Sequence, residues 1–422
     1  MHPEFGREHT SLPGDRFLPV LGLLLVALSM RAAIGVVGPL FAAMSGDLGL
    51  GSTILGFLGA APPLAFAVGG LLTPALVRRV GLERALIVVL LLLTLGQAAR
   101  ALSGEAIGLV LFTFLSVLGI GAANVLLPPI VRRWFPKHIA GATSVYLSLL
   151  ALSAAIPSVV VVPISDVLGW RSALAVWIVL PILAILPWWG LVRPGEERAR
   201  TAGDAAEWQG RRGPGKPIVA SPTAWALVLV MLLPSISIYT AAAILPVILV
   251  ETGGLTPTGA GIAMGIVYVL GIPLAMLVPV TRRHPGLTLP LIGLAGAVNL
   301  VGWAGVLLAP AGAPFVWATL IGLGPITFPL AMFLVNLRSR AEGTTVALSG
   351  FVQGLAYLLA AVAALGLGLL HDATHSWSAT LVLLAACSVV VVPGIIVLAR
   401  GRFVDDELAR ATRDRVPPPL PR

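Results

Sequence analysis

A single arginine stands out among the side chains that could bind a substrate. Arg31 lies near the middle of an apolar run from about residue 17 to residue 44. A charge at the centre of a membrane-spanning helix costs about 2.5–3.5 kcal/mol on insertion scales, so it is retained where a cavity, a partner or a ligand receives it. Its planar fork of donors matches a carboxylate, a cyanate or a nitro group. We expect Arg31 to bind an anion. The alternative is that it bonds carbonyl groups at a helix end and holds its span against a neighbour.

Other polar side chains inside the apolar segments are candidates for the same site. A buried hydroxyl or amide needs a hydrogen-bond partner, which is either a ligand or a neighbouring helix. A bond between helices contributes about 0.6 kcal/mol on average in a membrane protein, so neither role is favoured by energy alone. These candidates are Tyr146, Tyr239, Tyr268 and Tyr357 together with Asn124, Asn299 and Gln353.

The acidic residues limit how a proton could be coupled to transport. All 18 Asp and Glu residues fall in expected tails, loops or span ends. Proton-driven carriers commonly use carboxylates or histidines inside the membrane as relays. A co-transported proton would therefore travel with a weak-acid substrate or through residues near the loops.

The sequence gives no support for an enzyme, a cofactor or a metal site. His371 and His375 flank an acid in one turn, but no third ligand lies nearby, and a closed zinc site usually has four. No glycine-rich phosphate loop follows a strand, and no nucleophile and base form a pair. The single cysteine, Cys387, excludes a disulfide within the chain.

Composition indicates an integral membrane protein. Of the 422 residues, 58% are hydrophobic and 11% are charged, whereas a soluble domain has about 25% charged residues. Twelve apolar runs are long enough to cross a bilayer, for which about 20 residues suffice. They cover residues 17–44, 52–76, 83–103, 105–131, 138–163, 170–192, 222–250, 258–281, 287–309, 311–337, 342–370 and 376–400. The first is too long for the core of a signal peptide, so we expect it to be retained.

The positions of the basic residues predict the orientation. Of the 27 Lys and Arg residues, 24 lie in the two tails and in the connections after even-numbered spans. Only Arg100 and Arg171 fall on the other side, and Arg31 lies within a span. Because basic residues concentrate in cytoplasmic loops, both termini are expected in the cytoplasm of a bacterial-type inner membrane. The net charge of +9 then reflects topology and does not indicate a nucleic-acid partner.

A polar segment divides the spans into two halves. We expect a tail at 1–16, a six-helix bundle at 17–192, a cytoplasmic linker at 193–221, a second six-helix bundle at 222–400 and a tail at 401–422. The second half repeats features of the first in the same order. Gly322–Thr327 corresponds to Gly119–Asn124, and Gly343–Thr345 corresponds to Gly141–Thr143. Such a repeat is typical of transporters whose substrate site lies near the midplane between the halves.

The fourth span has a composition that favours bending. Gly121 allows close helix approach, and the pair Pro128 and Pro129 removes two backbone donors. We expect these residues to allow this span to flex during gating.

The connection after the second span resembles a loop signature of the major facilitator superfamily. It contains Arg78, Arg79, Gly81 and Arg84. Most of that superfamily has an aspartate where this chain has Pro74 or a neighbour. The positive-inside bias explains the arginines about equally well.

Further residues resemble the cyanate and nitroimidazole transporter branch of that superfamily over residues 17–400. They are Met30–Ile34 and Val37–Leu40 in span 1, Gly121–Pro128 in span 4, Leu168–Arg171, and Tyr239 with Leu245 and Pro246 in span 7. The resemblance implies an all-α fold of two pseudo-symmetric bundles, with spans 1, 4, 7 and 10 lining a cavity and spans 2, 5, 8 and 11 beside them. It also implies cyanate, a nitroimidazole or another small anion as substrate.

Within that arrangement we expect a substrate site around Arg31. Asn124, Tyr239, Tyr357 and Gln353 are the further pocket residues, and Tyr146 belongs either to the pocket or to a cytoplasmic gate. The predicted function is transport of a small anion or weak acid by alternating access, by a monomer embedded in the lipid bilayer, with a co-transported proton left open. The alternative is an exporter of neutral or nitroaromatic compounds in which Arg31 is structural. A channel or sensor is less well motivated, because the six-plus-six repeat suits rocking bundles.

Overall fold

The computed structural model describes residues 13–192, 218–340 and 342–413, and all of the regular secondary structure in these ranges is helical. The first half contains α1 (Pro13–Ser29), α2 (Ala32–Gly35), α3 (Val37–Leu48), α4 (Ser52–Val80), α5 (Leu82–Ala101), α6 (Ala106–Trp134), α7 (Ile139–Ala175) and α8 (Val179–Leu191). The second half contains α10 (Pro222–Glu251), α11 (Pro257–Val269), α12 (Gly271–Ala275), α13 (Val278–Arg283), α14 (Thr288–Leu308), α15 (Pro314–Leu323), α16 (Thr327–Leu337), α17 (Glu342–Thr374), α18 (Trp377–Val389), α19 (Val391–Leu398) and α20 (Val404–Arg413).

The helices account for the twelve predicted spans. Eleven helical segments in the described residues are long and apolar enough to cross a membrane. One of them, Gly141–Leu191, has 51 residues, and at 1.5 Å per residue it is about twice as long as a 30 Å hydrocarbon core requires. Gly169, with φ 79°, breaks it in two. A positive φ is accessible to glycine without a steric penalty, so this residue forms the turn between the fifth and sixth spans.

The first span is interrupted, although its sequence predicts one continuous apolar helix. α1 ends at Ser29, whose hydroxyl donates to the carbonyl of Val26 at 2.8 Å and competes with the backbone ladder. A second break falls at Val36, where Pro39 lacks the N–H that would bond the carbonyl of Gly35. Between the breaks lies the four-residue helix α2, with Arg31 at its start.

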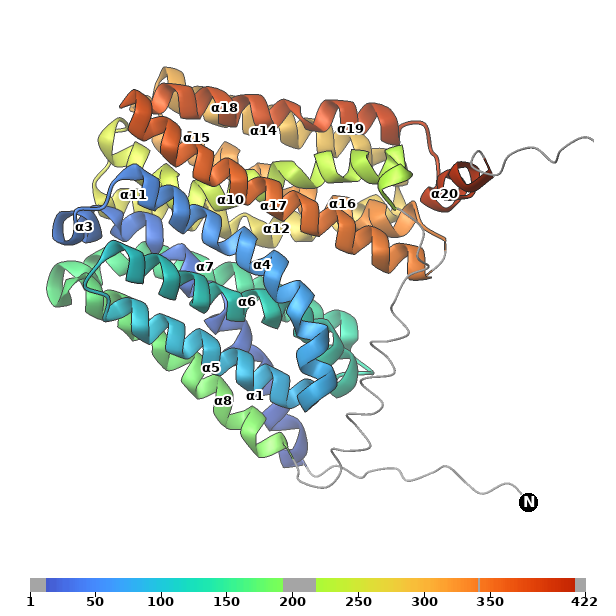
Figure 1. The fold of residues 1–422 in the computed structure, drawn as a ribbon, viewed down its shortest axis with the longest axis horizontal. Coiled ribbons are helices and arrows are strands. Elements are labelled where there is room, and N and C mark those ends of the chain that lie inside the picture. The colour runs from blue at the N-terminus through green and yellow to red at the C-terminus, as the bar shows by residue number, and fades with distance from the viewer. Residues whose placement is uncertain (1–12, 193–217, 341, 414–422) are drawn as a thin grey trace, which may run out of the picture.

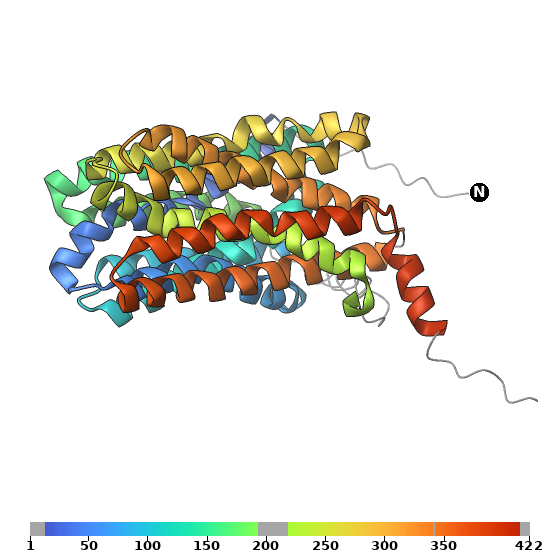
Figure 2. The same ribbon diagram turned by 90° about the horizontal axis from the view of Figure 1, so that it is seen from above.

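The two halves form two helix bundles that lie side by side (Figures 1 and 2). The N-terminal bundle comprises α1–α8, and the C-terminal bundle comprises α10–α19. In Figure 1, α20 lies at the right-hand end, which we call the termini end, and α3 lies at the opposite end, which we call the far end. Residues 193–217 of the predicted linker and most of the predicted tails lie outside the described residues.

Two predicted tails contain ordered structure at their inner ends. α1 begins at Pro13 and so includes residues assigned to the first tail. α20 forms within the segment predicted as the second tail, and its Glu407 is only 8% exposed. The Glu407 carboxylate accepts hydrogen bonds from the hydroxyls of Ser221 and Thr223 at 2.5 and 2.9 Å. The segment predicted as the second tail therefore contains a helix that is anchored to the bundle through Glu407.

At the far end the bundles are in close contact. A Cβ atom at Gly38 of α3 would lie 2.4 Å from the carbonyl oxygen of Ala242 in α10. A Cβ at Gly261 of α11 would lie 2.2 Å from the carbonyl oxygen of Ser158 in α7. Only glycine allows backbones to approach this closely. The far end is therefore closed in this conformation.

Toward the termini end the same interface separates. The rings of Phe66 in α4 and Tyr357 in α17 meet at 5.9 Å. About one turn closer to the termini end on the same helix faces lie Gly70 and Gly354, and Gly350 lies about two turns from Tyr357. Among the described residues, no atom outside the local helix backbone lies within 4 Å of a Cβ built on any of these glycines. Contact between α4 and α17 thus ends just beyond the two rings, and the bundles diverge toward the termini end.

One carboxylate links the two bundles across the closed end. Asp372 of α17 accepts from the backbone N–H groups of Ser52 and Thr53 at 3.1 and 2.8 Å and also from the Thr53 hydroxyl. These are the first residues of α4, so the carboxylate satisfies free N–H groups at a helix N-terminus. The three bonds must break before the bundles can separate at this end.

Replacing Asp372 with asparagine is expected to loosen the far end, because it removes the charge from hydrogen bonds of roughly 1.5–3 kcal/mol each. Spin labels at Gly46 and Ala373, which are exposed on opposite bundles, should report longer and broader distances in Asp372→Asn. Asp166→Asn, at the corresponding acid of the first half, is the matched control. Identical distance distributions in the two variants would rule out this role for Asp372.

Candidate functional site

Arg31 occupies the break in the first span, at the start of α2. Its side chain is half-buried, and its Nε atom is buried with no hydrogen-bond partner among the described residues. Its side chain makes no capping hydrogen bond to α2. The interrupted backbone therefore places a guanidinium between the bundles without an acid or carbonyl bonded to it in the part of the chain that the structure describes.

Three tyrosines surround this charge from the other bundle. The hydroxyls of Tyr239 in α10, Tyr268 in α11 and Tyr357 in α17 all lie within electrostatic range of Arg31. The rings of Tyr239 and Tyr357 are in T-shaped contact, with centroids 6.1 Å apart. One positive charge from the first bundle therefore faces three hydroxyls from the second, an arrangement in which both charge and donors can converge on one anion.

Aromatic rings form one wall of this region. Phe66, Tyr239 and Tyr357, which we call the aromatic cluster, meet in T-shaped pairs with centroids 5.7, 5.9 and 6.1 Å apart. Phe66 comes from the first bundle and the two tyrosines from the second. Such pairs contribute about 0.5–1.5 kcal/mol beyond their buried area, so the cluster holds the bundles together at mid-depth.

Tyr268 was one of the buried polar candidates from sequence but was not among the predicted pocket residues, and Phe66 was not a candidate. Tyr268 is 6% exposed, and its hydroxyl has no hydrogen-bond partner among the described residues. A buried hydroxyl left unpaired costs about 1–3 kcal/mol, which favours a role in receiving a ligand. The position of Tyr268 inside an apolar span indicated a buried hydroxyl, but the sequence did not show which side of the helix the residue occupies. Phe66 carried no signal in the sequence, because phenylalanine is common in apolar spans.

The remaining predicted pocket residues lie at different places. Gln353, one turn before Tyr357 in α17, donates to the hydroxyl of Ser349 at 2.9 Å. Asn124 is half-buried in α6, and Tyr146 is buried at 8% exposure in α7. Neither forms a hydrogen bond or a ring contact with the aromatic cluster among the described residues, so their assignment to the pocket stays a prediction.

Asn299 has a structural role in the second bundle. Its side chain donates to Ser237 Oγ and to the carbonyl of Ile321 at 2.9 and 3.1 Å, and it accepts from Ser388 at 2.9 Å. It is fully buried among helices of its own bundle. These bonds satisfy the amide without a ligand.

The predicted flexing residues lie in a helix that is continuous in this conformation. α6 runs through Pro128 and Pro129 without a break. A Cβ at Gly121 would lie 2.7 Å from the carbonyl oxygen of Ala65, so this glycine permits close packing of α6 on α4. Bending at these residues stays a prediction.

The predicted loop motif lies at the termini end. Arg78 and Arg79 occupy the last turn of α4, Gly81 turns the chain with φ 84°, and Arg84 follows in the first turn of α5. The adjacent Glu83 accepts from Arg133 Nη1 at 3.1 Å through both carboxylate oxygens. This ion pair ties α5 to α6 within one bundle.

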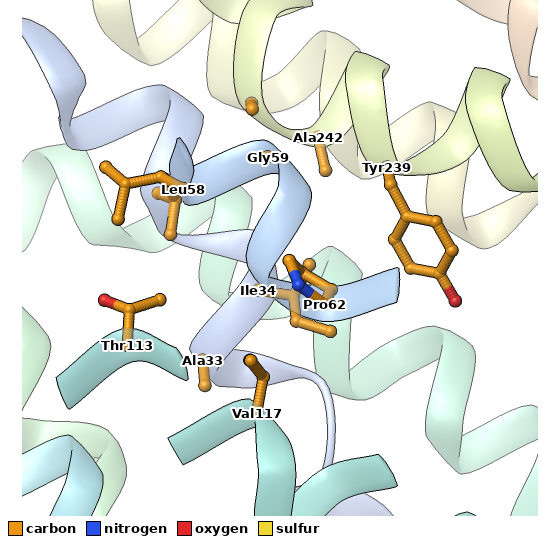
Figure 3. A pocket seen from close by; sticks show the side chains of 11 residues that line it. Ala33, Ile34, Leu58, Gly59, Pro62, Thr113, Val117, Tyr239 and Ala242 are labelled. Carbon is orange, nitrogen blue, oxygen red and sulfur yellow. The ribbon is translucent and has the colours of Figure 1, made fainter. Parts of the chain in front are cut away.

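A small cavity lies beside the site, between the bundles (Figure 3). Its volume is about 10 Å³, which is room for about one water molecule. Its lining comes from both bundles: Ala33, Ile34, Val37, Leu58, Gly59, Pro62, Thr113, Val117, Tyr239, Ala242 and Ala243. Nearly all of these side chains are apolar, so polar recognition has to come from Arg31 and the tyrosine hydroxyls.

A second arginine is buried in the first bundle. The sequence assigns Arg100 to the side opposite the termini, at the end of the apolar run 83–103, and the structure places it in the last turn of α5, where it is 1% exposed. Its Nη1 donates to the carbonyl of Ala33 at 2.7 Å. Arg31 is therefore not the only intramembrane cation, although Arg100 bonds the backbone whereas Arg31 does not.

Comparison with known sequences identifies the family. The family model described as the Major Facilitator Superfamily matches residues 23–361 of this chain. The chain belongs to the Major Facilitator Superfamily. This membership, together with the relatives described below that are named as transporters, agrees with the predicted all-α membrane fold. It also agrees with the prediction that the protein is a transporter and not an enzyme.

Three curated relatives cover most of the chain. The uncharacterized transporter YycB of Bacillus subtilis (strain 168) is 32% identical over 89% of this chain and 91% of its own. The 2-nitroimidazole transporter of Escherichia coli (strain K12) is 31% identical over 93% and 98%, respectively. The cyanate transport protein CynX of the same organism is 25% identical over 85% and 91%. These matches confirm the resemblance to the cyanate and nitroimidazole branch.

Solved structures share the superfamily fold. The inward open conformation of the xylose transporter XylE from E. coli has a TM-score of 0.67 at 14% identity, covering 94% of this chain and 99% of that one. A POT family transporter in complex with 5-aminolevulinic acid has a TM-score of 0.69 at 14% identity, covering 93% and 96%. At these identities the likeness concerns the fold alone.

Proposed function

We propose that this superfamily member carries a small anion or weak acid across a bacterial-type inner membrane by alternating access, with Arg31 as the residue that binds the charge. The observation that supports the proposal is the convergence of an unbonded guanidinium from the first bundle and three tyrosine hydroxyls from the second. A cyanate, carboxylate or nitro group between them would accept charge-assisted hydrogen bonds from both sides. The names of two relatives, a cyanate and a 2-nitroimidazole transporter, are consistent with such cargo.

The same residues suggest how binding would drive the cycle. Without cargo, moving the bundles together at the termini end would desolvate the Arg31 charge, which is costly. A bound anion neutralises that charge and lowers the cost of closure. With both termini in the cytoplasm, as the basic residues predict, the described conformation would be closed to the outside and open to the cytoplasm.

A second candidate function is export of neutral or nitroaromatic compounds. The aromatic cluster favours it, because Phe66, Tyr239 and Tyr357 offer ring faces and edges to a planar ligand. In that case Arg31 would be structural, Arg31→Lys would be tolerated, and hydrophobic compounds would compete for transport.

Uptake into proteoliposomes separates the two candidates. Labelled cyanate should enter saturably and should be inhibited by small carboxylates and by excess cyanate, but not by neutral aromatic compounds of similar size. Saturable transport of 2-nitroimidazole that small anions do not inhibit would favour the second function. A membrane current carried without saturation would indicate a channel and contradict both.

Tyr239 and Tyr357, whose rings are in contact, should each contribute to affinity. Tyr239→Phe and Tyr357→Phe remove a donor but keep the ring, and a hydrogen bond between neutral donors and a charged group contributes roughly 1.5–3 kcal/mol. We expect the cyanate KM to rise roughly tenfold in either variant, with the maximal rate little changed. Thr319→Val, at an exposed hydroxyl of α15 that donates to the carbonyl of Phe315 in its own helix, is the control and should leave KM unchanged. Equal effects in all three variants would argue against a specific pocket.

A further inference from the structure

The helix that carries the binding arginine is too short to hold itself in place. α2 has four residues, so it has no complete set of internal backbone bonds, and both of its ends have free polar groups. Arg31 precedes it directly. The direction in which the guanidinium points therefore depends on what fixes α2 from outside.

Arg100 supplies one fixed contact. It reaches from α5 to the carbonyl of Ala33, at the centre of α2, with an N···O distance of 2.7 Å. Its Nε and Nη2 atoms are buried and have no hydrogen-bond partner among the described residues. Burying a guanidinium that makes a single hydrogen bond costs several kcal/mol. Side-chain packing alone therefore does not account for an arginine at this buried position.

The opposite contact of α2 is a close backbone approach. A Cβ at Gly35 would lie 2.6 Å from the carbonyl oxygen of Ala154 in α7. α2 is thereby held between a hydrogen bond from α5 and the backbone of α7. Both contacts lie within the first bundle, so they can persist while the bundles rock.

Arg100 itself does not face the cargo. α5 packs on α4, α6, α7 and α8, all within the N-terminal bundle, and Arg100 is 1% exposed. The guanidinium that faces the second bundle is that of Arg31, as its electrostatic interactions with the three tyrosines indicate.

We propose that Arg100 is a positioning residue: its bond to the Ala33 carbonyl fixes the interrupted segment of span 1 and so orients Arg31 toward the cargo. The effect on transport rests on the proposed function of Arg31, whereas the effect on the backbone does not. A cation is suited to this role because it donates strongly to a carbonyl and cannot be satisfied by the apolar helices around it.

The test compares Arg100→Met, which keeps much of the volume, with Arg100→Lys, which keeps the charge and one donor. Arg171→Met, at an exposed arginine paired with Asp47, is the matched control. The first readout is amide hydrogen exchange of residues 32–37 in purified protein without substrate. We expect exchange there to become at least about tenfold faster in Arg100→Met, to be partly restored in Arg100→Lys and to be unchanged in the control.

The second readout is cyanate transport. Arg100→Met should raise the cyanate KM roughly tenfold with little change in the maximal rate per folded molecule, and Arg100→Lys should recover part of the affinity. The double variant with Arg31→Gln should be no weaker than Arg31→Gln alone, because the two residues act through one contact.

Two results would overturn the proposal: exchange of residues 32–37 that is unchanged in Arg100→Met, or a loss of affinity that adds to that of Arg31→Gln. If Arg100→Met does not fold, the same readouts in Arg100→Lys decide. If the wild-type protein does not transport cyanate, or if Arg31→Gln transports it normally, the proposed function fails, and the exchange measurement still decides whether Arg100 holds the segment.

Discussion

Replacing Arg31 with glutamine is expected to abolish saturable anion uptake while the protein remains folded in the membrane. The variant keeps a polar side chain of similar length but loses the charge that would face the cargo. Removing one partner of a buried charge pair costs roughly 3–5 kcal/mol, which corresponds to at least about a hundredfold loss of affinity. Uptake of labelled cyanate by proteoliposomes containing equal amounts of protein measures this loss.

The control for this prediction is Arg171→Gln, at an arginine that is exposed at the far end and bonded to Asp47. It should transport like the wild type. Arg31→Lys should recover part of the activity, because it restores the charge without the planar fork. Unchanged uptake kinetics in Arg31→Gln would remove the anion-binding role and leave Arg31 as a structural residue.

The second large effect is expected from a substitution that prevents closure of the far end. Gly38→Ala would place a Cβ atom 2.4 Å from the Ala242 carbonyl oxygen of the other bundle, where no side chain can move to make room. The bundles would have to separate, so the described conformation should become inaccessible. We expect cyanate transport to fall to background while the purified variant still binds the anion from its other open conformation.

Gly46→Ala is the matched control, since it changes a glycine of the same helix whose Cβ position has no atom within 4 Å among the described residues. It should leave transport unchanged. Normal transport by Gly38→Ala would show that the close contact at the far end is not required for the cycle.

Hydropathy was sufficient to predict the membrane class and the twelve spans, whereas the family was predicted from the resemblance of residues such as Met30–Ile34 and Gly121–Pro128. Long apolar runs are hard to mistake, because few other structures need about 20 consecutive apolar residues. Tyr239 and Tyr357 could be proposed as pocket residues from a resemblance that places their spans around the cavity. Their mutual ring contact and their proximity to Arg31 could not, because helix rotation depends on packing between spans.

The hydropathy pattern did not predict the break in the first membrane-spanning helix at Arg31. The apolar run continues through it, and the interruption depends on local details such as the Ser29 hydroxyl and the missing N–H of Pro39. The burial of Arg100 could not be predicted for a related reason. A charge near the end of an apolar run is usually in a loop, yet α5 extends to Ala101 and turns Arg100 into the bundle. α20 was missed because its charged composition is typical of a tail.

The most direct test of the central claim is anion binding to purified protein, read as thermal stabilisation. Cyanate, small carboxylates and nitroaromatic compounds are added to the wild type, Arg31→Gln and Arg171→Gln. A ligand at a hundred times its dissociation constant adds about 2.7 kcal/mol of stability. The wild type and Arg171→Gln should be stabilised saturably by at least one small anion, and Arg31→Gln should not be. Equal stabilisation of Arg31→Gln by that anion, or stabilisation of the wild type by neutral compounds alone, would contradict an anion site built on Arg31.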